Sequence, residues 1–190
     1  MTRFGLFLVI LLATGISTRG QNPLSVSPPE KNNSPQAELA SFSIDSRLQI
    51  NLFADESIGI ANPICFRWDT RGRLWVLCTW AYPQLKPGTK PDDKLIILED
   101  TNSDGKADKI STFADGLNMP TGFALGHGGA YIGNGRDLIH VRDTSGNGKA
   151  DQKEILFTGF GTGDTHQNIN SFAWTPGGEL LFCQGLHCFS

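Results

Sequence analysis

Two Asp- and Gly-rich segments hold the residues best suited to binding a metal ion. Segment 100–111 reads DTNSDGKADKIS, and segment 143–154 reads DTSGNGKADQKE. Calcium takes about six to eight oxygen ligands, and a twelve-residue loop supplies them from alternate positions, with a glycine at the sharp turn. The predicted ligands are Asp100, Asn102, Asp104, the Lys106 carbonyl and Asp108 in the first loop, and Asp143, Ser145, Asn147, the Lys149 carbonyl, Asp151 and Glu154 in the second.

The two loops differ in the positions of their carboxylates and in their last residue. The first has three carboxylates, but Ser111 stands where a bidentate Glu is usual. The second has Glu154 at that position, whereas Ser145 and Asn147 lower its negative charge. We interpret both as structural calcium sites that stabilise strand connections. The alternative is a pair of Asx-Gly turns without metal, since Asp and Asn readily accept hydrogen bonds from their own backbone.

The segments around these loops repeat. A strand–turn–strand pattern occurs at 66–76, 123–132 and 172–182, and each copy places a glycine at the end of its turn: Gly72, Gly129 and Gly178. Glycine suits such turns because it adopts positive φ without steric cost. A further apolar run leads into each predicted calcium loop and another follows it, and the loops lie 43 residues apart, from Asp100 to Asp143.

Four short strands in about 45–55 residues match the strand count and length of a β-propeller blade. We therefore predict an all-β chain that forms a partial β-propeller, with two blades and the start of a third, over residues 39–190. Propellers close with about four to eight blades, so we expect this domain to be truncated. An unpaired sheet edge of that kind favours aggregation.

The N-terminus is typical of an exported protein. Arg3 precedes an apolar run over 4–13, which is shorter than the ~20 residues that a membrane span needs. We predict a signal peptide over 1–20, a flexible Pro-, Ser- and Asn-rich linker over 21–38, and a periplasmic or extracellular location. The alternative is an uncleaved N-terminal segment that associates with the membrane. The net charge of −3 argues against a nucleic-acid partner.

The four cysteines are expected to be free or buried thiols. They are Cys65, Cys78, Cys183 and Cys188, and they allow three pairings. If Trp68 pairs with Arg73 across a hairpin, Cys65 faces Val76, and Cys78 lies diagonally at the limit of a disulfide. The segment from Cys183 to Cys188 lacks the C-x-x-C-H spacing of haem attachment.

Two long segments carry several motifs in one order, DDKLIILEDTNSDGKADKISTFADGL and LIHVRDTSGNGKADQKEILFTGFGTGDTHQNINSFAWTPGGELLFCQGLH. In that order they resemble the membrane-bound dehydrogenase family abundant in planctomycetes and related bacteria, over residues 61–190. The resemblance implies a propeller related to soluble quinoprotein glucose and sorbosone dehydrogenases. It implies pyrroloquinoline quinone as cofactor and a sugar or another alcohol as substrate. Larger members continue into helical repeats and a c-type haem domain, so electron transfer to haem is not predicted for this chain.

The resemblance also directs attention to segment 159–170, GFGTGDTHQNIN. In quinoprotein sugar dehydrogenases a His takes the proton as hydride passes from the sugar to the quinone. His166, oriented by Asp164, would be that base, because imidazole accepts a proton near neutral pH. Arg136 would help to hold an anionic cofactor or sugar. The alternatives are a His that stabilises its turn and a solvated Arg, and His127 and His140 show no neighbours that indicate chemistry.

Two function classes follow from these residues. One is an exported, calcium-binding, quinoprotein-like dehydrogenase that acts on sugars or other alcohols. The other is a non-enzymatic, calcium-stabilised β-propeller that serves as a binding module at the cell surface. The first requires His and Arg side chains around a cofactor, whereas the second requires only the calcium loops and an accessible surface.

Overall fold

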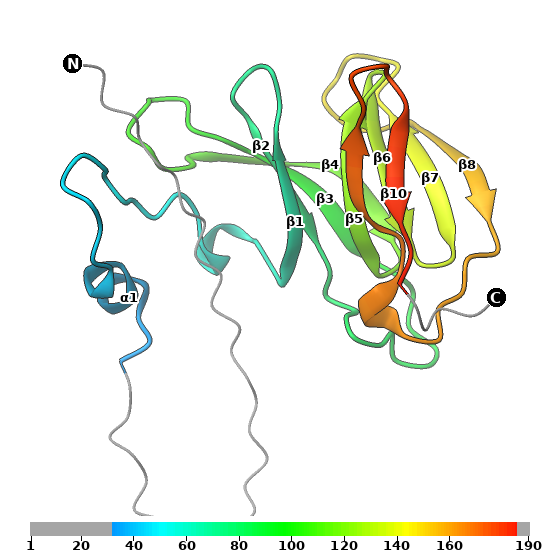
Figure 1. The fold of residues 1–190 in the computed structure, drawn as a ribbon, viewed down its shortest axis with the longest axis horizontal. Coiled ribbons are helices and arrows are strands. Elements are labelled where there is room, and N and C mark those ends of the chain that lie inside the picture. The colour runs from blue at the N-terminus through cyan, green and yellow to red at the C-terminus, as the bar shows by residue number, and fades with distance from the viewer. Residues whose placement is uncertain (1–31, 186–190) are drawn as a thin grey trace, which may run out of the picture.

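The computed structural model describes residues 32–185 (Figure 1). The predicted signal peptide, most of the predicted linker and Cys188 lie outside these residues. Helix α1 (Pro35–Ser41) begins within the predicted linker, because Ser34 caps it and Pro35 occupies its first turn. Regular structure therefore begins earlier than predicted. Within residues 32–185, no helix is long and apolar enough to cross a membrane.

Apart from α1 and two short 3-10 helices, η1 (Glu56–Ile58) and η2 (Thr165–Gln167), the described chain consists of strands and their connections, as predicted for an all-β protein. Antiparallel pairing forms two four-stranded sheets, in the orders β1-β2-β3-β4 and β5-β6-β7-β8, and a two-stranded sheet of β9 and β10. The strands are β1 (Pro63–Trp68), β2 (Leu74–Cys78), β3 (Asp93–Glu99), β4 (Lys109–Leu117), β5 (Pro120–Gly126), β6 (Gly129–Asn134), β7 (Asp137–Arg142), β8 (Gln152–Thr158), β9 (Asn170–Trp174) and β10 (Leu180–Cys183).

The three predicted strand–turn–strand repeats are the hairpins β1–β2, β5–β6 and β9–β10, which confirms that pattern. The predicted register of the first hairpin is wrong. The Asp69 N–H donates to the Arg73 carbonyl (3.0 Å), so these two residues close the turn. Trp68 therefore pairs with Leu74, and Cys65 lies opposite Leu77 rather than Val76.

The turn of the second hairpin is also shorter than predicted. His127 and Gly128 form it, with φ of 49° and 80°. Two consecutive residues with positive φ match the tight hairpin turns whose twist suits antiparallel strands. Gly129, predicted to end the turn, is already the first residue of β6.

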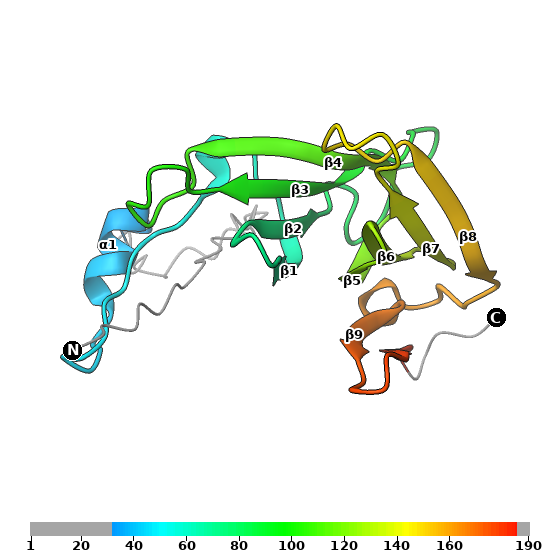
Figure 2. The same cartoon turned by 90° about the horizontal axis from the view of Figure 1, so that it is seen from above.

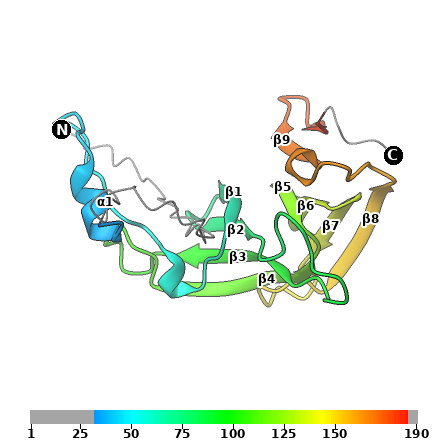
Figure 3. The same ribbon diagram turned by 90° about the horizontal axis from the view of Figure 1, so that it is seen from below.

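The sheets follow one another in an open arc (Figures 2 and 3). The first strands of the three sheets lie along its inner side, where β1 contacts β5 and β5 contacts β9. The last strands of the four-stranded sheets, β4 and β8, lie along its outer side. Within the described residues the arc does not close.

Apolar side chains on both faces of a sheet build a core on each face. Successive side chains of a strand point to opposite faces. In β2, Trp75 and Leu77 therefore face the second sheet, whereas Leu74 and Val76 face the segment that holds Phe53. A third core, which includes Ile169 and Phe172, joins the second sheet to β9 and β10. All five β2 residues are buried for this reason.

Neighbouring strands run in opposite directions, so their connections lie at two opposite ends of the sheets (Figure 1). We call one the turn end: it carries the hairpin turns 69–73, 127–128 and 175–179 and both predicted calcium loops. We call the other the loop end: it carries the β2–β3 loop (79–92), the β4–β5 connection (118–119), the β6–β7 turn (135–136) and the β8–β9 connection (159–169). The predicted catalytic residues and the predicted metal ligands therefore lie at opposite ends.

Candidate functional site at the loop end

Asp93, the first residue of β3, holds the long β2–β3 loop in place. Its carboxylate is fully buried and accepts hydrogen bonds from the Thr79 hydroxyl (2.8 Å) and from the backbone N–H groups of Trp80 (2.6 Å) and Ala81 (3.0 Å). A fourth hydrogen bond comes from the Met119 N–H in the β4–β5 connection (2.8 Å). Asp93 therefore joins two connections of the loop end.

His166 lies on η2, against the β2–β3 loop. Asp164 caps η2 by accepting from the His166 backbone N–H (3.0 Å), and its Oδ1 atom lies 2.8 Å from the ring Nδ1. The His166 ring meets the Tyr82 ring edge-on, with centroids 5.3 Å apart. The Thr165 hydroxyl donates to the Pro83 carbonyl (2.9 Å). The structure thus brings Asp164 and His166 together and leaves the His166 side chain 66% exposed.

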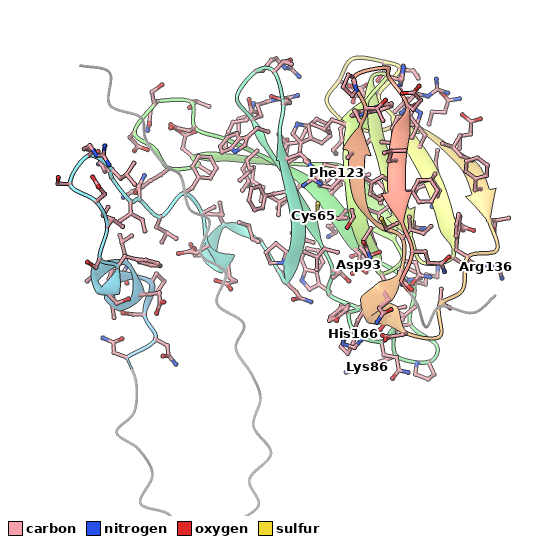
Figure 4. All side chains as sticks on the ribbon, viewed as in Figure 1. Cys65, Lys86, Asp93, Phe123, Arg136 and His166 are labelled. Atoms are coloured by element: carbon pink, nitrogen blue, oxygen red, sulfur yellow. The ribbon has the colours of Figure 1, made fainter. Side chains whose placement is uncertain are left out.

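Arg136 does not join this pair. It is exposed in the β6–β7 turn, where its backbone carbonyl accepts from the Phe160 N–H (3.2 Å). Figure 4 shows Arg136 and His166 at separate places along the loop end. The predicted grouping of all three residues around one reacting centre is therefore not formed.

Pyrroloquinoline quinone stays a prediction. This planar polycarboxylate would need several cationic partners next to the base. Tyr82, Pro83 and the acidic Asp164 contact η2, and Arg136 lies apart. The lysines beside Tyr82 belong to the β2–β3 loop.

A cavity of about 640 Å³ lies within the β2–β3 loop, next to Tyr82. That volume is within the usual range for sites that bind small molecules. Its lining includes Trp80, Tyr82, Lys86, Lys90 and Lys94. Sequence reasoning missed this site, although a signal was present. A 14-residue connection, 79–92, between two antiparallel strands is unusually long, and long loops in compact domains are often functional.

At the turn end, the predicted ligands of the first calcium loop lie close to the loop backbone. The Asp100 carboxylate accepts from the Gly105 N–H (2.8 Å), and Asn102 Oδ1 accepts from the Asp104 N–H (2.9 Å). Gly105 has φ of 85°, as expected for the sharp turn. The Asp104 carboxylate in turn accepts from the Lys106 N–H (2.8 Å), so the side chains at the first, third and fifth positions turn inward.

The second loop repeats this arrangement. Asp143 accepts from the N–H groups of Gly146 and Gly148 (both 2.7 Å), and Asn147 accepts from the Lys149 N–H (2.8 Å). These backbone hydrogen bonds, led by that from Gly148, hold the pKa of Asp143 below its usual value. Gly148 has φ of 88°, and the Ser145 hydroxyl donates to Asp143 (3.2 Å).

The side chains of the remaining predicted ligands bind protein groups other than a shared central point. Asp108 accepts from the Thr101 hydroxyl (2.8 Å), and Asp151 accepts from the Thr144 hydroxyl (2.8 Å). Glu154 lies in β8, where its Oε2 atom is 3.6 Å from the Arg142 guanidinium. Among the described residues, no three acidic, His or Cys side chains gather closely enough to hold a metal ion. The loops satisfy their own polar groups as Asx turns, and calcium stays a prediction.

His127 and His140 have partners that the sequence did not reveal. The Tyr131 ring stacks on His140 at 4.0 Å between centroids, and the Tyr131 hydroxyl lies 2.9 Å from His127 Nδ1. Trp174 packs edge-on against both Tyr131 and His127. Burial lowers the pKa of His140, although its hydrogen bond to the Gly126 carbonyl opposes the shift. This cluster joins the second sheet to β9 and is structural.

Among the cysteines of residues 32–185, Cys65, Cys78 and Cys183 are free thiols. Cys78 is fully buried in β2, and burial raises the pKa of its thiol to about 11.

Comparisons with known proteins give a family and one distant structural likeness. No curated protein matches the sequence. The chain is similar to a solved structure entitled "Iodide structure of Trichoderma reesei Carbohydrate-Active Enzymes Family AA12", with a TM-score of 0.43 and 13% identity over 63% of this chain and 28% of that chain. It thus spans little more than a quarter of that protein. A family model described as a domain of unknown function, DUF7133, matches residues 34–188. The chain therefore belongs to the DUF7133 family.

Proposed function

We propose that this chain is the substrate-binding and proton-accepting part of an oxidoreductase that acts on sugars or other alcohols, with His166 as the base. The observation that carries this proposal is the 2.8 Å contact between Asp164 Oδ1 and His166 Nδ1, next to Tyr82, which lines the loop-end cavity. In the same proposal, the two four-stranded sheets are propeller blades and β9–β10 opens a third.

The contact sets the roles of the two imidazole nitrogens. An ionised carboxylate can only accept hydrogen bonds, so Nδ1 carries the proton and Nε2 keeps its lone pair. A neutral imidazole held in this tautomer is suited to general-base catalysis. The Nε2 atom would take the hydroxyl proton of an alcohol bound beside Tyr82.

Oxidation of an alcohol also removes a hydride from carbon. The family resemblance implies a quinone as the acceptor of that hydride, supplied as a separate cofactor. Proton removal and substrate binding are therefore the parts that we assign to this chain. Calcium, if bound, would be structural, because its predicted loops lie at the turn end.

The alternative is a non-enzymatic, calcium-stabilised binding module. The exposed Trp80 beside the cavity favours it as the second candidate, because a binding site needs such a platform and no base. The two candidates differ in one respect: only the oxidoreductase converts the bound ligand in a reaction that depends on His166.

Calorimetric titration of the full chain with a panel of sugars and polyols tests the binding part. Turnover of the bound sugars is then followed with an electron-accepting dye, with pyrroloquinoline quinone and calcium added. We expect His166→Gln to lower kcat by about 100-fold, within the range for removal of a general base, and to leave the sugar Kd unchanged. His127→Gln, at the turn end, serves as the matched control.

Sugar binding without turnover would support the binding module and overturn the oxidoreductase. Turnover that survives His166→Gln unchanged would remove His166 from the chemistry. If no sugar or polyol binds at all, the site assignment at the loop end is wrong.

A further inference from the structure

We propose that the cavity of the β2–β3 loop selects acidic carbohydrates, which carry carboxylate or sulfate groups. This inference rests on the proposed function, since it names the substrate class of the same site. Three observations carry it: the charge of the lining, the aromatic platform, and the anchoring of the loop against His166.

The lining is basic in a chain that is acidic overall. The net charge of the chain is −3, whereas Lys86, Lys90 and Lys94 all line this one cavity. Lys94 is 3.4 Å from Asp92, and the Asp93 carboxylate is buried beneath the loop with four donors. Within residues 32–185, Lys86 and Lys90 form no ion pair. With Asp93 counted, the lining has a formal net charge of +1, and Lys86 and Lys90 are the two ammonium groups open to an anionic ligand.

A tight turn separates the two lysines in the loop. The Thr89 N–H donates to the Lys86 carbonyl (3.1 Å), and Gly88 has φ of 79°. Proline followed by glycine with positive φ is typical of a type II turn. The turn thus separates Lys86 from Lys90 by a short, defined step, so one ligand can reach both ammonium groups.

Trp80 provides the surface on which a sugar ring can stack. Its side chain is 51% exposed, an unusual placement for tryptophan, and the Lys94 Nζ atom lies 5.3 Å from the ring centroid. An indole face binds apolar C–H surface and positive charge, whereas its edge offers one donor. A pyranose that stacks there would share the cavity with the three lysines.

The loop is anchored at both sides of the cavity. Asp93 fixes Trp80 and Ala81 through their N–H groups, and Thr165 of η2 donates to the Pro83 carbonyl. Tyr82 lies between them and meets His166 edge-on. A carbohydrate held by its acidic groups in the loop would therefore extend toward His166.

Calorimetric titration of the full chain tests the inference with three probes: a galacturonic acid trisaccharide, a sulfated galactose trisaccharide, and the neutral galactose trisaccharide. We expect at least one acidic probe to bind about tenfold more tightly than the neutral one, the size of one charge-assisted hydrogen bond. The stronger acidic probe identifies carboxylate or sulfate as the recognised group. Raising the salt concentration should remove most of the difference, since these lysines are exposed.

Variants separate the charge from the platform. Lys86→Ala/Lys90→Ala should abolish the preference for the acidic probe and leave neutral binding unchanged, whereas Trp80→Ala should weaken all three probes. The matched control is Lys106→Ala/Lys153→Ala, which removes the same charge away from the loop end and should change nothing.

Equal binding of acidic and neutral probes overturns this inference and leaves the proposed function standing. An acidic preference that survives Lys86→Ala/Lys90→Ala also overturns it, because the charge would then lie elsewhere. If none of the probes binds, the proposed function and the inference fail together.

Discussion

The Asp164 Oδ1 atom lies 2.8 Å from the Nδ1 atom of His166 and 3.0 Å from its backbone nitrogen. One carboxylate oxygen thus caps η2 and orients the imidazole that the helix carries. The same contact therefore serves local structure and, in the proposed function, chemistry. A variant that keeps the cap but weakens the orientation can separate the two roles.

Asp164→Asn is such a variant, because Asn is as good a helix cap as Asp but carries no charge. We expect kcat for a bound alcohol to fall at least about tenfold, since orientation contributes part of the benefit of a general base. The midpoint of thermal unfolding should not change. The two measurements are dye-linked turnover and a thermal melt.

Asp45→Asn is the matched control, because it removes the same charge at an exposed position that lines neither the cavity nor His166. If Asp164→Asn and Asp45→Asn lower kcat equally, the effect is one of net charge. Asp164 would then have no orienting role.

Asp93→Asn should destabilise the fold and loosen the β2–β3 loop. The buried carboxylate accepts four hydrogen bonds, and the amide that replaces it presents an N–H₂ group to some of the same donors. We expect a loss of about 3 kcal/mol in the free energy of unfolding, measured with urea. Hydrogen exchange at the Trp80, Ala81 and Met119 amides should accelerate as well.

Asp92→Asn provides the comparison for stability, because its side chain is exposed. It should change the free energy of unfolding by less than about 0.5 kcal/mol. Similar losses for the two variants would mean that Asp93 does not anchor the loop.

Alternation and repetition along the chain predicted the strands well, because burial on both faces of a sheet imposes a period of two on apolar residues. The turns were less predictable. Gly129 was expected to end a turn, but it lies in β6, where a Cβ atom would come within 1.8 Å of the Val141 carbonyl oxygen. A glycine required by close packing and one required by positive φ look the same in a sequence.

The candidate site was predicted only in part. Asp164 and His166 are two residues apart, so their contact follows from local geometry. The β2–β3 loop meets η2 from more than 80 residues away, and the hydrogen bond from Thr165 to Pro83 has no local signal. Likewise, the stacking of Tyr131 on His140 depends on the pairing of β6 with β7.

His140 should make the stability of the protein decrease as the pH falls. Burial lowers the pKa of His140 below 6.5, and the nearby charges of Arg142 and His127 add to the decrease. The hydrogen bond to the Gly126 carbonyl and the charge of Glu154 oppose it. The folded state therefore favours the neutral ring. The stability from this preference is fully present above pH 6.5 and is lost as the pH falls toward the folded pKa.

In His140→Phe, the free energy of unfolding should decrease less between pH 7.5 and about pH 5.5 than in the wild type, as measured in urea at both values. Val141→Ala is the control, because it destabilises the same strand without removing a titrating group. It should keep the wild-type dependence on pH. If His140→Phe keeps that dependence too, His140 is not its source.

Cys78 should resist thiol reagents in the folded protein. Its thiol is fully buried, and the raised pKa of about 11 leaves little thiolate at pH 8. In Cys183→Ser/Cys188→Ser, we expect Ellman's reagent to modify the partly buried Cys65 before Cys78, which should react only at the rate of unfolding. Added urea should release the second thiol. Equal and rapid reaction of both cysteines without urea would show that β2 opens readily.

Calcium should raise the thermal unfolding midpoint if the Asx loops of the turn end bind it. Backbone hydrogen bonds, led by those from Gly148 and Thr144, hold the pKa values of Asp143 and Asp151 below normal, so both carboxylates are charged at neutral pH. Binding at about 100 times the Kd would add about 2.7 kcal/mol of stability. The test is a thermal melt with calcium or with a chelator.

Two variants show which loop binds the calcium: Asp100→Asn removes the first ligand of the first loop, and Asp143→Asn removes that of the second. Glu56→Gln in η1 is the control, because it removes the same charge outside both loops. Loss of the calcium effect in Asp100→Asn alone would place the ion in the first loop. A calcium effect in every variant would mean a site elsewhere. No effect in the wild type would identify both loops as Asx turns that the hydrogen bonds from Thr101 and Thr144 suffice to hold.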